Sequence, residues 1–328
     1  MPDQLIFAME VFLNGLMAGV LYALVALGFV LIYKASGIFN YAQGVMALFA
    51  AMTLVGIMNG QVPFAHLINA TFGTHAHKFG WNIPAFLAIL MTMAVMVLLA
   101  WAVQRFVMRH LVGQEPIILF MATIGLAYFL EGVADLMWGS EIKKLDVGLP
   151  QGINLWIDET TFNIFGYGFF IDNLDLVATV IAALLVTALV AFSQYTKQGR
   201  AMRAVADDHQ AALSVGISLN FIWIMVWSVA GFVALVAGIM WGTKSGVQFS
   251  LSLIALKALP VLMLGGFTSI PGAIVGGLII GVGEKLFEFA IGPLVGGATE
   301  NWFAYVLALI FLVFRPQGLF GEKIIERV

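Results

Sequence analysis

Long runs of sequence without a single Asp, Glu, Lys or Arg are the feature that most constrains this chain. Val11–Tyr33, Ala35–His77, Asn82–Gln104 and His209–Thr243 are such runs. An α-helix needs roughly 20 apolar residues to cross a bilayer core of about 30 Å, and each of these runs is long enough. Hydrophobic residues make up 62% of the chain and charged residues only 10%, a composition far from that of a water-soluble domain. We therefore predict an integral membrane protein.

The apolar residues come in unbroken blocks of helical length instead of alternating along short strands, which favours an all-α polytopic fold over a β-barrel. We expect about eight to ten transmembrane helices. The first is expected to be retained, because Met1–Glu10 lacks the basic start of a signal peptide. The expected crossings lie at about 7–33, 41–60, 84–105, 116–138, 174–195, 220–242, 250–268, 272–292 and 299–315.

The crossing at 250–268 is the weakest of these, because Lys257 and Pro260 interrupt its apolar run. A broken or re-entrant helix is expected there. Cytoplasmic loops of membrane proteins are enriched in Lys and Arg. The Lys and Arg of this chain follow that rule if the N-terminus is outside and the C-terminus is cytoplasmic, so we predict that orientation. The whole chain, 1–328, then forms a single transmembrane domain with a cytoplasmic loop at 197–219 and extracytoplasmic loops at 61–83 and 139–173.

Several kinds of chemistry are excluded by residue content. The net charge of −3 does not support nucleic-acid binding, and the absence of cysteine excludes disulfides and thiolate metal sites. The dipeptide Gly-Lys does not occur, so the chain has no phosphate-binding loop of its own. His75 and His77 have no further metal ligands near them in the sequence. We expect no catalytic residue, no metal and no cofactor in this chain.

Ionisable residues within the apolar blocks are too few for a proton relay, which disfavours an ion-coupled pump. The carboxylates near the expected spans are Glu131, Asp135, Glu284 and Glu288. A membrane-embedded enzyme would need a paired nucleophile and base, and no such pair stands out. A pore or a translocation subunit remains.

The loop at 197–219 has the composition of a short helix that docks on another protein. Its alanine-rich stretch from Arg200 to Val215 favours helix, and Gly216 supplies a left-handed stop. Arg203 and Asp207 stand four residues apart and are expected to pair. The small residues Ala211 and Ala212 leave the helix closely approachable, which suits docking into a groove.

Gln210-Ala211-Ala212 followed by Gly216 is similar to the Glu-Ala-Ala, three residues, Gly pattern of the coupling helix in ABC importer membrane subunits, with Gln in place of Glu. Further blocks resemble the branched-chain amino acid permease family, and specifically the H-type subunit of the high-affinity Leu/Ile/Val importer. These blocks are Gly28–Tyr33, Gly37–Gly44, Gly199–Ala204, Leu264–Ala273 and Phe314–Gly321. The chain departs from the family at Gln43, where His is frequent, and at Thr268, where Gly is frequent.

The resemblance implies the translocation subunit of a binding-protein-dependent ABC importer in the bacterial cytoplasmic (inner) membrane. Its expected partners are two ABC ATPase subunits that bind ATP and Mg, a second homologous permease subunit, a periplasmic or extracellular binding protein and membrane lipid. A sister branch that carries urea or short-chain amides stays open, as does a self-sufficient channel. The residues expected to couple to the ATPase are Arg200, Arg203, Asp207, Ala211, Ala212 and Gly216.

Polar and small residues within the apolar blocks are the remaining candidates. A polar side chain inside a membrane needs a partner or a water-filled path, and small residues let helices approach closely. The candidates for the translocation path are Asn40, Gln43, Thr123 and Lys257. The candidates for helix packing are Gly15, Gly19, Gly265, Gly266, Pro271, Gly272, Gly276 and Gly277.

Overall fold

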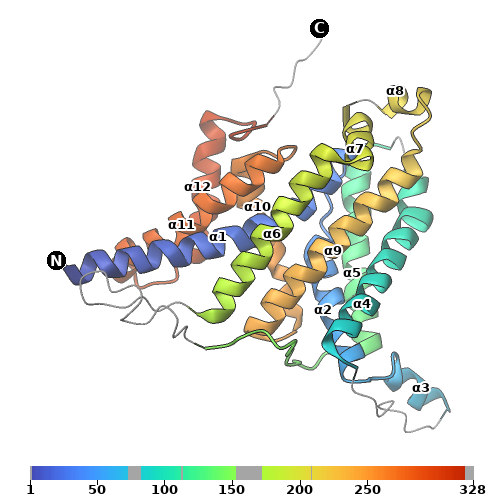
Figure 1. The fold of residues 1–328 in the computed structure, drawn as a ribbon, viewed down its shortest axis with the longest axis horizontal. Coiled ribbons are helices and arrows are strands. Elements are labelled where there is room, and N and C mark those ends of the chain that lie inside the picture. The colour runs from blue at the N-terminus through green and yellow to red at the C-terminus, as the bar shows by residue number, and fades with distance from the viewer. Residues whose placement is uncertain (1, 73–82, 112–113, 153–171, 208, 322–328) are drawn as a thin grey trace. The chain divides into compact units, whose positions relative to one another are not determined.

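A computed structural model describes residues 2–72, 83–111, 114–152, 172–207 and 209–321 (Figure 1). These residues form α-helices joined by short turns and brief π- and 3₁₀-helical pieces, and the only extended pairing among them is an isolated bridge between Lys143 and Val247. The predicted all-α fold is confirmed. The helices are α1 Pro2–Ser36, α2 Gln43–Met58, α3 Ala65–Phe72, α4 Ala85–Ala102, η1 Val103–Val107, η2 Met108–His110, α5 Pro116–Trp138, α6 Asn173–Tyr195, α7 Lys197–Asp207, α8 His209–Ser214, α9 Leu219–Ser245, η4 Phe249–Leu253, α10 Ile254–Gly265, α11 Ile270–Val295 and α12 Glu300–Phe314.

Five helices in the described part of the chain are long and apolar enough to cross a membrane, or up to six if a bent pair counts as one span. The five are Phe7–Ser36, Ala85–His110, Pro116–Trp138, Asn173–Tyr195 and Leu219–Ser245. The polytopic prediction is therefore confirmed. The expected crossings at 41–60 and 299–315 are helices too, but α2 has 16 residues and α12 has 15. At 1.5 Å per residue, helices of this length fall short of a full span.

The bent pair includes the crossing at 250–268, where a broken or re-entrant helix was expected, but α10 continues through Lys257 and Pro260 and the bend follows Gly265. Phe249–Gly265 and Ile270–Val295 meet at 114°. The turn between them passes through Gly266, whose φ of +102° lies in a region that side chains with a Cβ rarely adopt. Pro271 then occupies the first turn of α11, where its missing N–H leaves no helical hydrogen bond unmade.

The chain divides into two compact units. One unit comprises Met1–Val30, Leu149–Val190 and Leu256–Val328, and the other comprises Leu31–Gly148 and Ala191–Ala255. We call them the first and second units. Of the two loops expected outside the membrane, residues 73–82 and 153–171 lie outside the described residues, and these include His75 and His77.

The second unit is built around α2, which is buried along nearly its whole length. α2 contacts α4, α5 and α9. Glycine residues allow the closest approach between these helices. A Cβ on Gly238 of α9 would stand 2.5 Å from the Ala47 carbonyl oxygen of α2. Glycine at this position therefore lets the two backbones touch, as in other membrane helix pairs.

Lys143 links several segments at one end of the second unit. Its backbone pairs with Val247, while its ammonium donates to the Gln61 side chain at 2.8 Å and to the Trp138 carbonyl. Burial lowers the pKa of the Lys143 ammonium, and the nearby Glu141 carboxylate opposes that shift. This side chain thus connects the end of α5 with the turn that follows α2.

Candidate functional site

Asn40, Gln43 and Thr123, all predicted for the translocation path, lie together in the second unit. Their exposed fractions are 0%, 1% and 0%. Asn40 Nδ2 donates to Gln43 Oε1 at 3.4 Å, and Gln43 Nε2 donates to the Ala230 carbonyl of α9 at 3.2 Å. Asn40 Oδ1 accepts from the Ala42 N–H at 3.2 Å, which shapes the turn into α2.

Thr123 holds the same turn from α5. Its hydroxyl accepts from the Tyr41 N–H at 3.1 Å, and its single proton has two acceptors in reach, the Phe120 carbonyl of α5 at 2.8 Å and the Phe39 carbonyl at 3.1 Å. The three polar side chains thus form one buried junction between α2, α5 and α9, and we call it the polar junction. In this conformation its groups bind one another and the backbone, so a role in the path requires the turn to move.

Lys257, the fourth residue predicted for the path, lies in the first unit on α10. Its ammonium forms an ion pair with Glu284 of α11 and donates to the Glu300 carbonyl at 3.2 Å. The Glu284 side chain is fully buried, whereas that of Lys257 is 29% exposed. The Tyr22 ring of α1 lies below the ammonium, which is 6.0 Å from the ring centre. The sequence analysis assigned Lys257 to the translocation path and did not identify Glu284 as its partner.

A second charged group lies further along α11 in the same unit. Lys285 Nζ pairs with Glu300 Oε1 at 2.8 Å, and both side chains are about one-third exposed, at 34% and 32%. Glu288 accepts hydrogen bonds from the backbone N–H groups of Ala298, Thr299 and Glu300 and from the Thr299 hydroxyl, so it caps the start of α12. Sequence reasoning missed this cluster, although the spacing of Glu284, Lys285 and Glu288 on an apolar helix was a signal for it.

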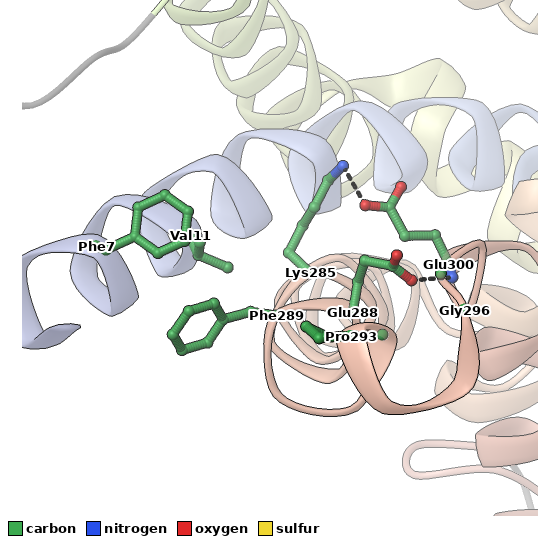
Figure 2. A pocket seen from close by; sticks show the side chains of 10 residues that line it. Phe7, Val11, Lys285, Glu288, Phe289, Pro293, Gly296 and Glu300 are labelled. Atoms are coloured by element: carbon green, nitrogen blue, oxygen red, sulfur yellow. Dashed lines mark hydrogen bonds and ion pairs between the residues drawn. The ribbon is translucent and has the colours of Figure 1, made fainter.

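These charges border a cavity of about 530 Å³ in the first unit (Figure 2). Lys285, Glu288 and Glu300 line one end, and the rings of Phe7 and Phe289 line the other. Among the described residues, no group of three or more His, Asp or Glu is placed to hold a metal ion.

The glycines predicted for helix packing in the first unit lie at close backbone contacts. A Cβ on Gly19 of α1 would stand 2.6 Å from the Gly277 carbonyl oxygen of α11, and one on Gly15 would stand 2.7 Å from the Val282 Cα. α1 and α11 therefore touch along these residues. The bend between α10 and α11 is equally tight. The contacts there join Gly265 to Gly272, Gly276 to the Val261 carbonyl, and Gly266 to Gly318 and Gly321 of the C-terminal turn.

In the predicted coupling segment the structure describes α7 and α8, on either side of residue 208, which lies outside the described residues. The predicted Arg203–Asp207 ion pair is absent between these two described residues, and Arg203 instead donates to the Gln194 carbonyl at 3.4 Å. Arg200 is exposed on α7. Gly216 has a φ of +83°, so the helix ends in the left-handed region.

α8 presents different residues from those expected. Ala212 is only 2% exposed and therefore packs inside the unit, while Ala211 lies on the exposed side. The exposed apolar side chains are Leu213 at 53% and Val215 at 73%. These two residues form the apolar surface of the segment, and we call it the α8 tip.

Comparison with known proteins gives similarity along the whole chain. Residues 11–315 match the family described as branched-chain amino acid transport system / permease component. The high-affinity branched-chain amino acid transport system permease protein LivH of Salmonella typhimurium is 28% identical over 335 residues, which covers 100% of both chains. The corresponding protein BraD of Pseudomonas aeruginosa is 30% identical over 325 residues, 96% of each chain.

A more distant relative carries a different name. The fructose import permease protein FrcC of Rhizobium meliloti is 28% identical over 160 residues, which covers 45% of this chain and 42% of FrcC. The match to the permease family, in contrast, spans nearly all of the helices described above. The chain therefore belongs to the branched-chain amino acid transport system permease family, and it is a multi-pass membrane permease subunit of an ABC importer.

Proposed function

We propose that this chain forms, with a second homologous permease subunit, the translocation path for branched-chain aliphatic amino acids across the bacterial cytoplasmic membrane. The observation that carries the proposal is the similarity to LivH and BraD over the full length of all three chains. Two separate ABC ATPase subunits bind ATP and Mg and drive transport, and a binding protein delivers the amino acid. The chain itself performs no covalent chemistry.

Coupling to the ATPases is assigned to α7 and α8. The Gly216 N–H bonds to the Leu213 carbonyl at 3.0 Å, and the Ile217 N–H bonds to the Ala212 carbonyl at 3.0 Å, so the end of α8 is a closed turn. Ser218 follows directly and caps α9 through the Phe221 N–H. A displacement of the α8 tip by an ATPase is therefore transmitted to α9 through a short, hydrogen-bonded link.

α9 in turn is hydrogen-bonded to the polar junction, because its Ala230 carbonyl accepts a hydrogen bond from the Gln43 side chain. A movement of α9 along its axis breaks this bond and frees the Gln43 amide. A freed amide provides both a donor and an acceptor, which is what a polar zwitterion needs as it passes through an apolar protein. We infer that the polar junction belongs to the path in the conformation that ATP produces.

The proposal is tested by purifying the tagged chain in mild detergent from its native membrane and identifying the retained proteins by mass spectrometry. We expect two ABC ATPases and a second permease. As a matched control, Leu213→Arg is expected to retain the second permease but to lose the ATPases, because it places a charge in the α8 tip. A homo-oligomer without any ATPase would contradict the proposal and would favour a self-sufficient channel.

A further inference from the structure

The cavity in the first unit combines apolar walls with charges of both signs. Phe7 and Val11 of α1 face Phe289 and Pro293 of α11, and the Phe7 and Phe289 rings meet edge to face at 5.3 Å (Figure 2). Lys285, Glu288 and Glu300 gather at the opposite end. A volume of about 530 Å³ falls within the range of small-molecule sites, which are mostly apolar with a few convergent polar groups.

The Lys285–Glu300 pair is placed to exchange partners. Both side chains are about one-third exposed, and an ion pair so open to solvent contributes little to stability. The ammonium has three protons, of which Glu300 takes one. A ligand with a carboxylate and an ammonium would therefore replace one salt bridge by two without changing the net charge of the cavity.

The Glu288 carboxylate fixes the geometry of this end. It accepts from three backbone N–H groups and from the Thr299 hydroxyl, so it is fully engaged by the turn that carries Glu300. Glu288 is thus a positioning residue, and Lys285 and Glu300 are the groups available to a ligand. Because the cavity contains two carboxylates and one ammonium, a purely anionic ligand is disfavoured.

We propose that this cavity binds a free aliphatic amino acid in its zwitterionic form. Lys285 binds the α-carboxylate, Glu300 binds the α-ammonium, and the aliphatic side chain packs against Phe7, Val11 and Phe289. This assignment rests on the proposed function, because it gives that function a second ligand site, in a different unit from the polar junction. In an ABC importer that receives its substrate from a binding protein, such a site would retain the released amino acid until the translocation path opens.

A phospholipid headgroup with an ethanolamine ammonium offers the same charges, but the order of groups in the cavity disfavours it. Gly15 meets Gly281 and Phe7 meets Phe289, so α1 and α11 run in opposite directions. Measured along α1, Lys285 therefore lies closer to the middle of the membrane span than the rings of Phe7 and Phe289 do. A lipid places its charges at the membrane surface and its apolar chains inward, which is the reverse order. A free amino acid carries no such constraint.

The test is saturation-transfer NMR on the co-purified permease complex, without binding protein, in phosphatidylcholine nanodiscs. The probes are leucine, leucinamide, which lacks the carboxylate, and 4-methylpentanoate, which lacks the ammonium. We expect leucine to bind about tenfold more tightly than either analogue, since each lacks one charged hydrogen bond. Lys285→Met should weaken leucine and 4-methylpentanoate about tenfold and leave leucinamide unchanged. Glu300→Gln should weaken leucine and leucinamide and leave 4-methylpentanoate unchanged.

This crossed pattern does not arise from general loss of structure, which would weaken all three probes together. The exposed Lys144→Met variant serves as the matched control and should bind like wild type. Equal affinities for the three probes, or loss of leucine binding in phosphatidylethanolamine nanodiscs, would overturn the assignment. If the complex takes up leucine but the crossed pattern is absent, the site assignment fails alone. If the pattern is present without leucine uptake, the site stands and the proposed function falls.

Discussion

The ion pair between Lys257 and Glu284 predicts an asymmetric response to mutation. Lys257→Met leaves a fully buried carboxylate without its counter-charge. Glu284→Gln instead leaves an ammonium that is 29% exposed and that keeps the Glu300 carbonyl as an acceptor. The lysine variant should therefore be the less stable of the two.

The magnitude follows from the burial of each partner. Removing one half of a buried pair costs about 3–5 kcal/mol, and because Lys257 is partly exposed we expect Lys257→Met to cost about 3 kcal/mol. This corresponds to a change in the unfolding equilibrium on the order of a hundredfold. Glu284→Gln should cost about 1.5–2 kcal/mol, in the lower part of the range for a lost hydrogen bond to a charged group. The double variant Lys257→Met/Glu284→Leu should be close to wild type, because no buried charge remains.

The assay is reversible unfolding in mixed micelles by increasing SDS, followed by tryptophan fluorescence, with leucine uptake measured on the same preparations. The expected order of stability is wild type and the double variant, then Glu284→Gln, then Lys257→Met. A Lys257→Met variant that unfolds like wild type but has lost uptake would refute the reasoning. Lys257 would then act in the translocation path and not as half of a structural pair.

Three further substitutions test other parts of the structure. Gly216→Val should lower stability and uptake more than Gly216→Asn, because the left-handed φ of +83° strains a β-branched residue by about 1–2 kcal/mol or more and asparagine by less; equal uptake rates would argue against this backbone role. Leu213→Arg should abolish ATP-driven uptake while the protein elutes from size-exclusion chromatography as a folded species, and normal uptake would exclude docking through the α8 tip. Gln43→Leu should cost about 1–3 kcal/mol because it removes the hydrogen bonds of the Gln43 side chain with the Ala230 carbonyl and the Asn40 amide, and it should change the uptake rate with the complex still assembled. Loss of assembly would instead assign Gln43 to packing alone.

The sequence predicted the features that depend on local composition. Charge-free runs predicted the long helices α1, α4 and α9, whereas Lys257 and Pro260 lie within α10 and the bend follows Gly265. Gly216 was predicted as a left-handed stop, and its φ is positive. These features follow from residues adjacent in the chain, and the family motifs, which are also local, identified the family.

The features that depend on tertiary contacts were not predicted. Glu284 lies 27 residues from Lys257, so only the fold brings the two side chains together. The helical spacing of Arg203 and Asp207 predicted an ion pair, but the Gln194 carbonyl competes for the guanidinium. Ala212 was expected on the docking surface because it is small, yet its burial shows that it packs within the unit and leaves Leu213 exposed. Spacing along a helix does not determine which of its faces is covered.

ATP-dependent uptake of labelled leucine by proteoliposomes that contain the co-purified complex and its binding protein tests the central claim most directly. We expect uptake that requires ATP, Mg and the binding protein, that is competed by isoleucine and valine, and that is absent with urea as the labelled solute. Uptake of leucine without ATP would contradict the account, as would ATP-driven uptake of urea or a short-chain amide in place of leucine.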